Sequence, residues 1–577
     1  MPEIIFLTTS KAPPMGIGQL RKSLTAQGIQ SGLISFDEKF NKLTRKGQEN
    51  WTREGKNFVQ EVEKELKKMD LEKKGVKFFG MTMFDSLDQK VELDLVRMIK
   101  RIYPKITLIG GGPAFTSNPR GFFAQGKFDY AIRGEAENAL PKLIRAIKQK
   151  RNIEDVEGLV YRKSGKIITK PITLLSSEQI QKETMPIGGH SKAAMTYTER
   201  GCPRACIFCT VPRKGKPVQL ELNEIMRGLK QLARNPEIKW VSFMDDQLLH
   251  DRKRAIKLFR LINESGLNKR FNFAASVSVD SLLKNGAVDR ELINWLTRAR
   301  VRQVFVGTEA FNTPMLRELK GGRYTKEQAI ELNHALMGKK ISVENYALAA
   351  GIDTRARDFI EAYYNLQTIG QRRFNLSNQI GLVQAIKGTS IHETAVRENA
   401  LFNQRGKRTQ PVRDRQTGVR FVAPKEPLLA ELFSKQLKSG YSTLTLADLD
   451  KVIQLARTAG KTDLLAAKYV KKLLKLKGKL ISEINSTHTI TSHFYTDRVE
   501  RELAKRGLKF SEENAKKLLK NQNMDSNMIR QADKMTIAYK KQKSRIEQKR
   551  GLERLRAIQR MRHRLGQGMT LTVLRKK

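Results

Sequence analysis

The chain has 577 residues, with 109 Lys and Arg against 59 Asp and Glu, so its formal net charge is +50. A field of that sign attracts polyanions such as RNA. No apolar run reaches the roughly eighteen residues of a membrane span, so no transmembrane helix is expected. The sequence starts Met1-Pro2-Glu3 and enters a strand-like segment without a basic or apolar leader, so we expect a cytoplasmic protein.

Short apolar runs alternate with helix-like segments over residues 1–150. The strand-like runs are residues 3–7, 33–36, 75–82, 106–109 and 130–132. Apolar strands that are each followed by a helix predict an α/β domain with a doubly wound, Rossmann-like parallel sheet. The ligand crevice of such a sheet lies at the carboxyl ends of its strands, where glycines let the backbone approach a bulky ligand.

Residues 37–74 interrupt this layout with a long, charged insertion of helical period. Its sparse apolar stripe is Phe40, Trp51, Phe58, Val59, Val62 and Leu66. Bases and acids are close to balanced in this segment, so we interpret it as a solvated surface helix without a binding role.

All three cysteines of the chain, Cys202, Cys206 and Cys209, lie within eight residues in a C-x₃-C-x₂-C pattern. Thiolates this close can hold three irons of a four-iron four-sulfur cluster and leave the fourth iron open to a ligand. A Cys₃His zinc site needs a fourth ligand, and the nearest histidines, His190 and His250, lack the usual spacing. A disulfide is disfavoured, because so few cysteines in a large chain indicate a reducing compartment.

Residues 198–203, Thr-Glu-Arg-Gly-Cys-Pro, followed by Cys206, Phe208 and Cys209, resemble the cluster loop of radical S-adenosylmethionine (SAM) enzymes. The resemblance implies a reduced cluster whose open iron binds the amino and carboxylate groups of SAM. It also implies cleavage of SAM to methionine and a 5′-deoxyadenosyl radical, which abstracts hydrogen from a substrate. An external electron donor of the flavodoxin or ferredoxin type is then expected as a partner.

Strand-like and helix-like segments alternate again after the cysteines. The strand-like runs are residues 240–244, 271–278, 304–309, 342–348 and 380–385. This repetition predicts a second parallel sheet, rolled into a full or partial TIM-type (β/α) barrel over residues 191–400. Polar residues gather where each strand ends, on the rim that carries the ligands of such barrels.

The resemblance gives SAM-binding roles to residues at these strand ends and in the cysteine loop. Asp245 and Asp246 resemble the segment that holds the methionine end of SAM, and Glu309 resembles an acid near its ribose. The full set implied is Phe208, Asp245, Asp246, Ser278, Glu309, Gly351 and Val383. One departure is at residues 387–389, Lys-Gly-Thr, where the family often has Pro-Gly-Thr.

Residues 1–150 are similar to the cobalamin-binding domain that precedes the barrel in one large subclass of these enzymes. The similarity lies in Gly-Gly-x-Pro at residues 110–113, Gly-Glu-x-Glu at residues 134–137 and the linker at residues 156–161. There is no Asp-x-His-x-x-Gly, so no histidine would ligate cobalt, and a scaffold that has lost cobalamin is the alternative. The cobalamin contacts implied are Thr9, Gly16, Met81, Thr82, Gly110, Gly111, Gly112 and Glu135.

Four regions are expected: 1–150, a linker at 151–190, the barrel at 191–400 and a basic, mostly helical region at 401–577. From residue 461 onward there are about 31 bases and 11 acids. Residues 540–565 combine basic side chains with an apolar stripe of helical spacing. Such a helix could present its charge to RNA, to an anionic membrane or only to water.

Methyl transfer to an unactivated carbon is the reaction expected if SAM and cobalamin both bind, since cobalt can carry the methyl group. Cyclisation or rearrangement through the adenosyl radical alone is an alternative. A nucleic-acid-binding protein with a structural or redox-sensing cluster is another. Methylthio transfer is disfavoured, because it uses a second cluster with three further cysteines.

Overall fold

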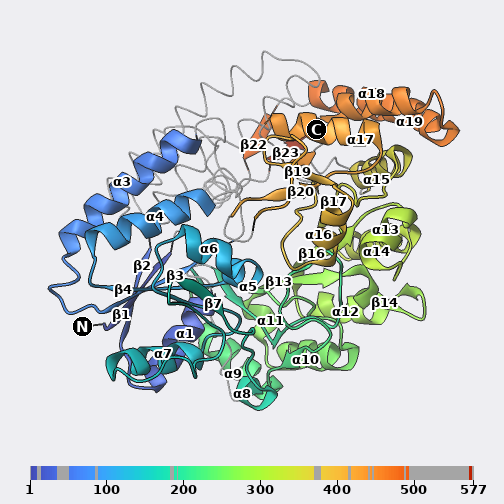
Figure 1. Cartoon of the computed structure of the whole chain (residues 1–577). Coiled ribbons are helices and arrows are strands. Elements are labelled where there is room, and N and C mark those ends of the chain that lie inside the picture. Colours follow the sequence, from blue (N-terminus) through green and yellow to red (C-terminus); the bar gives the residue numbers. More distant parts are fainter. Residues whose placement is uncertain are drawn as a thin grey trace, which may run out of the picture.

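The computed structural model describes residues 2–8, 15–35, 51–84, 89–181, 188–190, 193–369, 379–413, 417–439, 442–444, 448–486, 489–492 and 571–574. Thr9 and the basic segment 540–565 therefore lie outside the described residues. Two parallel sheets organise the chain. In Figure 1 the first sheet lies with the blue N-terminal elements, and the second lies with the green and yellow elements beside it.

The first sheet has seven strands in the order β2-β1-β3-β4-β5-β6-β7. The first five pair in parallel: β1 (Ile4–Thr8), β2 (Ser31–Ser35), β3 (Phe78–Thr82), β4 (Thr107–Gly111) and β5 (Tyr130–Ile132). The antiparallel hairpin of β6 (Leu159–Lys163) and β7 (Lys166–Thr169) extends the sheet into the expected linker. Because the strand order reverses direction between β1 and β3, a crevice is expected outside their carboxyl ends.

Helices cover both faces of this sheet because its strands are apolar on both sides. On one face, α1 (Met15–Ala26) and α7 (Ala139–Lys148) bury Leu24 and Leu143. On the other lie α3 (Trp51–Met69), α4 (Gln89–Ile102), α5 (Pro113–Ser117) and α6 (Pro119–Gln125). Phe58, Val62 and Leu66 of α3 are at most 1% exposed, so this part of the charged insertion packs into the core and is not simply a solvated surface helix.

The second sheet has the order β21-β18-β17-β16-β13-β12-β9-β8. Six strands pair in parallel in the order of the sequence: β9 (Ala193–Thr196), β12 (Trp240–Phe243), β13 (Asn272–Ser278), β16 (Val301–Glu309), β17 (Ser342–Leu348) and β18 (Gln379–Gly381). Antiparallel strands β8 (Gly188–His190) and β21 (Thr443–Leu444) form its edges. Among the described residues these edges do not pair with each other, so the sheet stays open.

Helices between these strands pack on the same face of the second sheet and bury Phe243, Phe273 and Val304. They include α9 (Leu222–Ala233), α10 (Arg252–Glu264), α12 (Arg290–Arg298), α13 (Thr313–Lys320), α14 (Lys326–Gly338) and α15 (Ala356–Thr368). After β18, α16 (Ser390–Arg397) packs instead in a separate apolar cluster through Ile391 and Ala395. Side-chain caps fix where several begin, because they satisfy the first free amides. Asp251, Asp289 and Asn312 start α10, α12 and α13 in this way.

The next part of the chain packs on this same core. A hairpin of β19 (Leu401–Asn403) and β20 (Arg420–Val422) leads into α17 (Pro427–Lys438), α18 (Leu449–Ala459) and α19 (Leu464–Ser486). Phe433, Ala456 and Leu473 are at most 1% exposed within it. A short pair, β22 (Thr489–Ser492) with β23 (Leu571–Leu574), completes the described elements. No helix in the described ranges is long and apolar enough to cross a bilayer.

Candidate active site

The three cysteines lie in one loop between β9 and α9, here called the cysteine loop (residues 197–217). Its base is closed by β10 (Glu199–Arg200) pairing with β11 (Val218–Gln219). Cys202 N donates to Arg213 O at 3.2 Å, Gly215 N donates to Cys202 O at 2.8 Å, and Cys209 N donates to Cys206 O at 3.1 Å. Backbone hydrogen bonds therefore fix the first and third cysteine positions, and Cys209 Sγ also accepts from Val211 N at 3.4 Å.

The sulfur atoms form one electrostatic group. Burial raises the pKa of the Cys202 thiol, and the charges of Asp246, Cys209 and Cys206 raise it further. Burial likewise raises the pKa of Cys209, with Cys206 and Asp246 adding to the effect. These mutual effects require the three thiols and Asp246 to lie near one another.

The donor set fits a four-iron cluster better than a single metal ion. No group of three or more His, Cys, Asp or Glu side chains in the described ranges is placed to hold one metal ion. In a four-iron cluster each thiolate binds a different iron, so the sulfur atoms need not converge on one point. None of the three cysteines is in a disulfide, and each is partly accessible.

A compact apolar cluster supports the third cysteine. Ile207 and Phe208 pack against the buried side chains of Leu319, Ile352, Val383, Ala385 and Ile391. Ile391 N, in the first turn of α16, also donates to Ile207 O at 3.1 Å. Phe208 and Val383, which the sequence assigns to SAM, thus meet in this apolar cluster at the end of β18.

Asp245, just after β12, holds the start of the cysteine loop. Its Oδ1 accepts from Thr198 N at 2.6 Å, Thr198 Oγ1 at 2.8 Å and Glu199 N at 2.8 Å. The side chain is 2% exposed, and burial together with the Glu199 charge raises the pKa of Asp245 to about 7. Asp246, by contrast, is exposed. The two neighbouring carboxyl groups therefore differ in role. Asp245 bonds to the backbone of the loop, and Asp246 faces solvent near the thiols.

Ser278, at the end of β13, connects that strand to the cysteine loop. Ser278 N donates to Gln247 Oε1 at 2.9 Å, and its hydroxyl bonds to Asp280. Asp280 Oδ2 in turn pairs with Arg204 Nη2 at 2.6 Å. Arg204 lies inside the cysteine pattern, and its role as an anchor was not predicted from the sequence.

Glu309, at the end of β16, is buried against a lysine that the sequence analysis missed. Lys320 Nζ lies 3.2 Å from Glu309 Oε1, 3.4 Å from Gly307 O and 3.5 Å from Ser278 Oγ. Burial raises the pKa of Glu309, although Lys320 acts in the opposite direction. Glu309 also has φ +54°, in a register shift of β16 against β17. A non-glycine residue in this region is uncommon and marks a locally constrained backbone.

Gly351 follows β17 and is in close contact with another unpredicted acid. A Cβ at this position would lie 1.9 Å from Glu318 Oε1, so any larger residue would displace the Glu318 carboxylate. Glu318 Oε2 accepts from Thr354 Oγ1 at 2.8 Å, and Thr354 Oγ1 accepts from Gly351 N at 2.9 Å. Gly351 therefore has a packing role whether or not it contacts a ligand. No sequence motif pointed to Lys320 or Glu318, because both lie in α13, away from any strand end.

The glycines of the first sheet serve different purposes. Phe115 fills the space in front of Gly110, where a Cβ would lie 2.4 Å from its ring. Gly112 has φ +93° and packs on Thr82 and the Met83 carbonyl. In front of Gly111 the nearest atom to a Cβ is 3.9 Å away, and around Gly16 there is open space. Met81 is 4% exposed. Gly16 and Gly111 thus have the most open surroundings among the predicted cobalamin contacts that are described.

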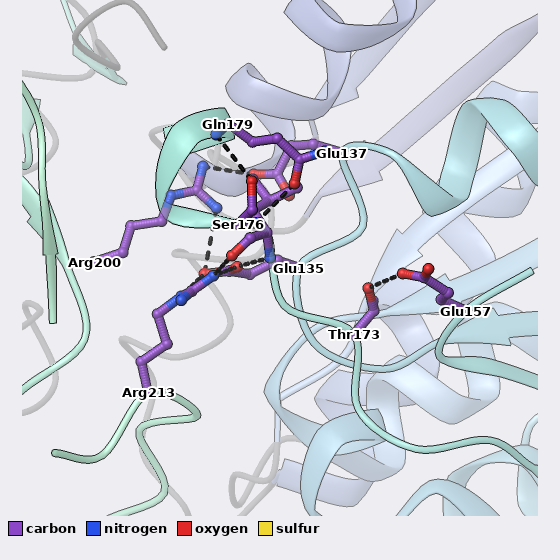
Figure 2. A network of polar contacts seen from close by, with 9 residues as sticks. Glu135, Glu137, Glu157, Thr173, Ser176, Gln179, Arg200 and Arg213 are labelled. Carbon is purple, nitrogen blue, oxygen red and sulfur yellow. Dashed lines mark hydrogen bonds and ion pairs between the residues drawn. The ribbon is translucent and has the colours of Figure 1, made fainter. Parts of the chain in front are cut away.

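Glu135 takes part in an ion-pair network with the cysteine loop (Figure 2). Its carboxylate accepts from Arg213 Nε at 2.8 Å, from Arg213 Nη2 at 2.6 Å and from Leu175 N at 2.7 Å. Burial alone would raise the pKa of Glu135, but these bonds and the Arg200 charge hold it below its usual value. Both carboxylate oxygens are thus engaged by protein groups.

Comparison with known proteins identifies the second sheet. Residues 197–363 match the radical SAM superfamily. That stretch contains the cysteine loop and β12 to β17. The chain therefore carries a radical SAM domain. The chain is 22% identical over 408 residues to an uncharacterised methyltransferase of Pyrococcus horikoshii, and the match covers 67% of this chain and 81% of the relative.

Two solved structures resemble the enzyme over most of its length. TsrM from Kitasatospora setae, a radical SAM methyltransferase with cobalamin and a four-iron cluster bound, has a TM-score of 0.57 at 15% identity and covers 74% of this chain and 84% of its own. OxsB, a cobalamin-dependent radical SAM enzyme with aqua-cobalamin and SAM bound, has a TM-score of 0.59 at 12% identity, covering 93% and 80%. The predicted α/β fold with a parallel-sheet radical SAM domain is thereby confirmed.

Proposed function

We propose that the chain is a cobalamin-dependent radical SAM methyltransferase that transfers a methyl group to an unactivated carbon. The observation that carries the proposal is that one chain combines two features. The first is the cysteine loop with its three thiols, and the second is the preceding parallel sheet, whose strand order reverses between β1 and β3. TsrM, which shares this overall fold, has cobalamin and a four-iron cluster bound, and OxsB has aqua-cobalamin and SAM bound. We keep the regions expected from the sequence, except that residues 401–486 are assigned to the domain of the second sheet, because α17 to α19 pack on its core.

The residues divide into separate tasks. Cys202, Cys206 and Cys209 would hold the cluster, which supplies the electron that cleaves SAM. Asp246, exposed beside the thiols, suits the charged methionine end of SAM. Glu309, with its carboxylate held by Lys320, suits the ribose hydroxyls. Asp245, Ser278 and Gly351 then act by holding the backbone that surrounds the ligand.

Cobalamin would use the crevice at the carboxyl ends of β1, β3 and β4. Gly111 and Gly16 leave room there for a bulky ring, and Thr82 and Gly112 shape the adjoining turn. Bound cobalamin supplies a methyl carrier. Since the Rossmann-like domain provides no Asp-x-His-x-x-Gly, the protein is expected to hold cobalamin without a histidine ligand.

The open face of the second sheet indicates the kind of substrate. Side chains that face away from the covering helices at its carboxyl half include Ser242, Ser276, Phe305, Glu344 and Tyr346. The rings of Phe305 and Tyr346 stack with centroids 6.0 Å apart and planes at 8°, and Tyr346 is 52% exposed. The single charge of this set is an acid, in a chain with 109 Lys and Arg. We therefore propose an uncharged, partly planar or apolar substrate group rather than a phosphate-rich one.

Equilibrium dialysis of anaerobically prepared enzyme against hydroxocobalamin tests the proposal. Retention of about one cobalamin per chain at tens of micromolar, with a spectral change that no histidine substitution removes, is expected. Gly111→Phe should abolish retention, because its ring would fill the open space in front of the strand end. Gly338→Phe, at an exposed position of α14 with open space around it, is the matched control and should retain cobalamin. If the native protein retains no cobalamin, the methyl-transfer proposal fails. Cyclisation or rearrangement by the adenosyl radical then takes its place.

A further inference from the structure

Two arginines of the cysteine loop, one on each side of the three cysteines, form ion pairs with the first domain (Figure 2). Arg200, two positions before Cys202, places Nη2 2.7 Å from Glu137 Oε1 and Nη1 3.5 Å from Glu135 Oε1. Arg213, four positions after Cys209, forms the bidentate pair with Glu135. Both ends of the cysteine loop are therefore tied to residues 135–137, which directly follow β5.

The four side chains are well shielded from water. Their exposed fractions are 11% for Arg200, 8% for Arg213, 14% for Glu135 and 11% for Glu137. Shielded charge pairs are screened little by salt, and removing one partner leaves the other charge buried. A solvated surface pair would not bind the two domains in this way, because such pairs contribute little.

The same segment touches the glycine crevice. Gly134 N donates to Thr116 Oγ1 at 3.2 Å, and Thr116 N and Oγ1 both donate to Gly112 O at 3.3 Å. Gly134 has φ +86°, and a Cβ there would lie 2.1 Å from Thr173 O, so the segment has little freedom to shift. Arg213 O, at the other end, accepts from Cys202 N. Hydrogen bonds thus connect the crevice to a cluster cysteine through Thr116, Glu135 and Arg213.

We propose that Glu135, Glu137, Arg200 and Arg213 form an interdomain latch. These are positioning residues: they hold the cysteine loop against the first domain and transmit occupancy of the crevice to that loop. The holding role stands on the printed contacts alone. The transmitting role rests on the proposed function, because it needs a crevice that binds cobalamin.

Hydrogen–deuterium exchange of the full-length apo protein tests the holding role. Glu137→Gln and Glu135→Gln should each raise exchange of amides in residues 198–215 by roughly tenfold or more, because local opening no longer breaks a buried ion pair. Glu154→Gln is the matched control. Glu154 Oε1 lies 2.5 Å from Lys163 Nζ in an exposed ion pair of the same domain, and the substitution removes the charge of Glu154. Its loop exchange should equal that of the native protein.

A second pair of variants separates the latch from general damage. Arg200→Gln combined with Glu137→Gln removes both charges, so its effect on loop exchange should be smaller than the sum of the two single effects on a logarithmic scale. Core amides in β3 and β4 should exchange as in the native protein in every variant. Additive effects, or loop exchange equal to the Glu154→Gln control, would overturn the holding role.

Hydroxocobalamin added to the same exchange experiment tests the transmitting role. In the native protein it should slow exchange in residues 198–215 as well as at the crevice, and in Glu135→Gln it should slow exchange only at the crevice. Protection confined to the crevice in both proteins would overturn transmission while leaving the holding role intact. Absence of retained cobalamin by dialysis overturns transmission together with the proposed function, and the apo exchange data still decide the holding role.

Discussion

At the scale of single residues, Asp245 and Gly351 were both predicted to contact SAM, and both also stabilise the protein around the site. One carboxylate oxygen of Asp245 accepts three hydrogen bonds from Thr198 and Glu199. The Glu318 carboxylate occupies the space beside Gly351. The sequence could place both at strand ends, because strand and motif positions are local features. It could not reveal Lys320 beside Glu309 or Glu318 beside Gly351, since those contacts come from tertiary packing of α13.

The raised pKa of Asp245 predicts a pH-dependent stability. Folding raises this pKa to about 7, so between about pH 4 and 7 the folded protein binds the proton more tightly than the unfolded chain. The contribution of Asp245 to the free energy of unfolding should therefore fall as pH rises through this window and level off above it. Asp245→Asn lacks this titration, so the stability of the native protein relative to this variant should decline by a few kcal/mol, at about 1.4 kcal/mol per pKa unit.

Urea unfolding of apo protein at several pH values measures this difference. Asp251→Asn serves as the control, because Asp251 caps α10 through Arg254 N and Asn caps helices equally well. If the difference in free energy of unfolding between the native protein and Asp245→Asn stays constant from pH 4 to 8, the assigned burial of Asp245 is contradicted.

At the scale of elements, the order of strands and helices was predictable from periodicity, but their partners were not. The alternation after residue 240 predicted the parallel sheet, because each strand and helix has its own local signal. The β6–β7 hairpin joining the first sheet and α17 to α19 joining the second core depend on contacts between distant segments. Gly478 lies inside α19, which runs on to Ser486. A glycine inside a helix lowers its stability but does not by itself end it.

The apolar cluster beneath Phe208 predicts how firmly the loop holds a metal cluster. Phe208→Ala removes the ring that packs on Val383 and its neighbours, so the third cysteine loses support. Iron release to a chelator from reconstituted protein should become roughly tenfold faster, as with other changes around metal ligands. Phe208→Leu should release iron at an intermediate rate, because it keeps part of the apolar contact. Release rates equal to native in both variants would show that the ring does not support the loop.

At the scale of the whole molecule, two sheets meet at a junction made of ion pairs, and the net charge of +50 is spread over the chain. The existence of two α/β units was predictable, because each carries a complete strand–helix pattern. The latch between them was not, since Glu135 and Arg213 are far apart in the sequence and carry no shared motif. The role of the basic segment 540–565 stays a prediction from the sequence.

That segment is expected to govern binding of RNA, if RNA binds. Affinity for polyuridylate should then fall steeply with salt, because each neutralised phosphate of a single strand releases about 0.7 counterion. Ending the chain before Lys540 should weaken binding and flatten the salt slope, while cluster content is unchanged. Filter binding at several salt concentrations measures both quantities. Equal, weak binding by the full and shortened chains would show that the segment does not bind RNA. Its positive charge would then reflect only the general amino-acid usage of the source.

Cleavage of SAM by the reconstituted chain tests the central claim most directly. Anaerobic protein loaded with iron and sulfide should hold about four of each per chain, and with a strong reductant it should form 5′-deoxyadenosine. Replacing Cys202, Cys206 or Cys209 singly with Ala should abolish both cluster and product, because each thiolate holds its own iron. Bound zinc in place of iron, with no 5′-deoxyadenosine from the native protein, would contradict the account.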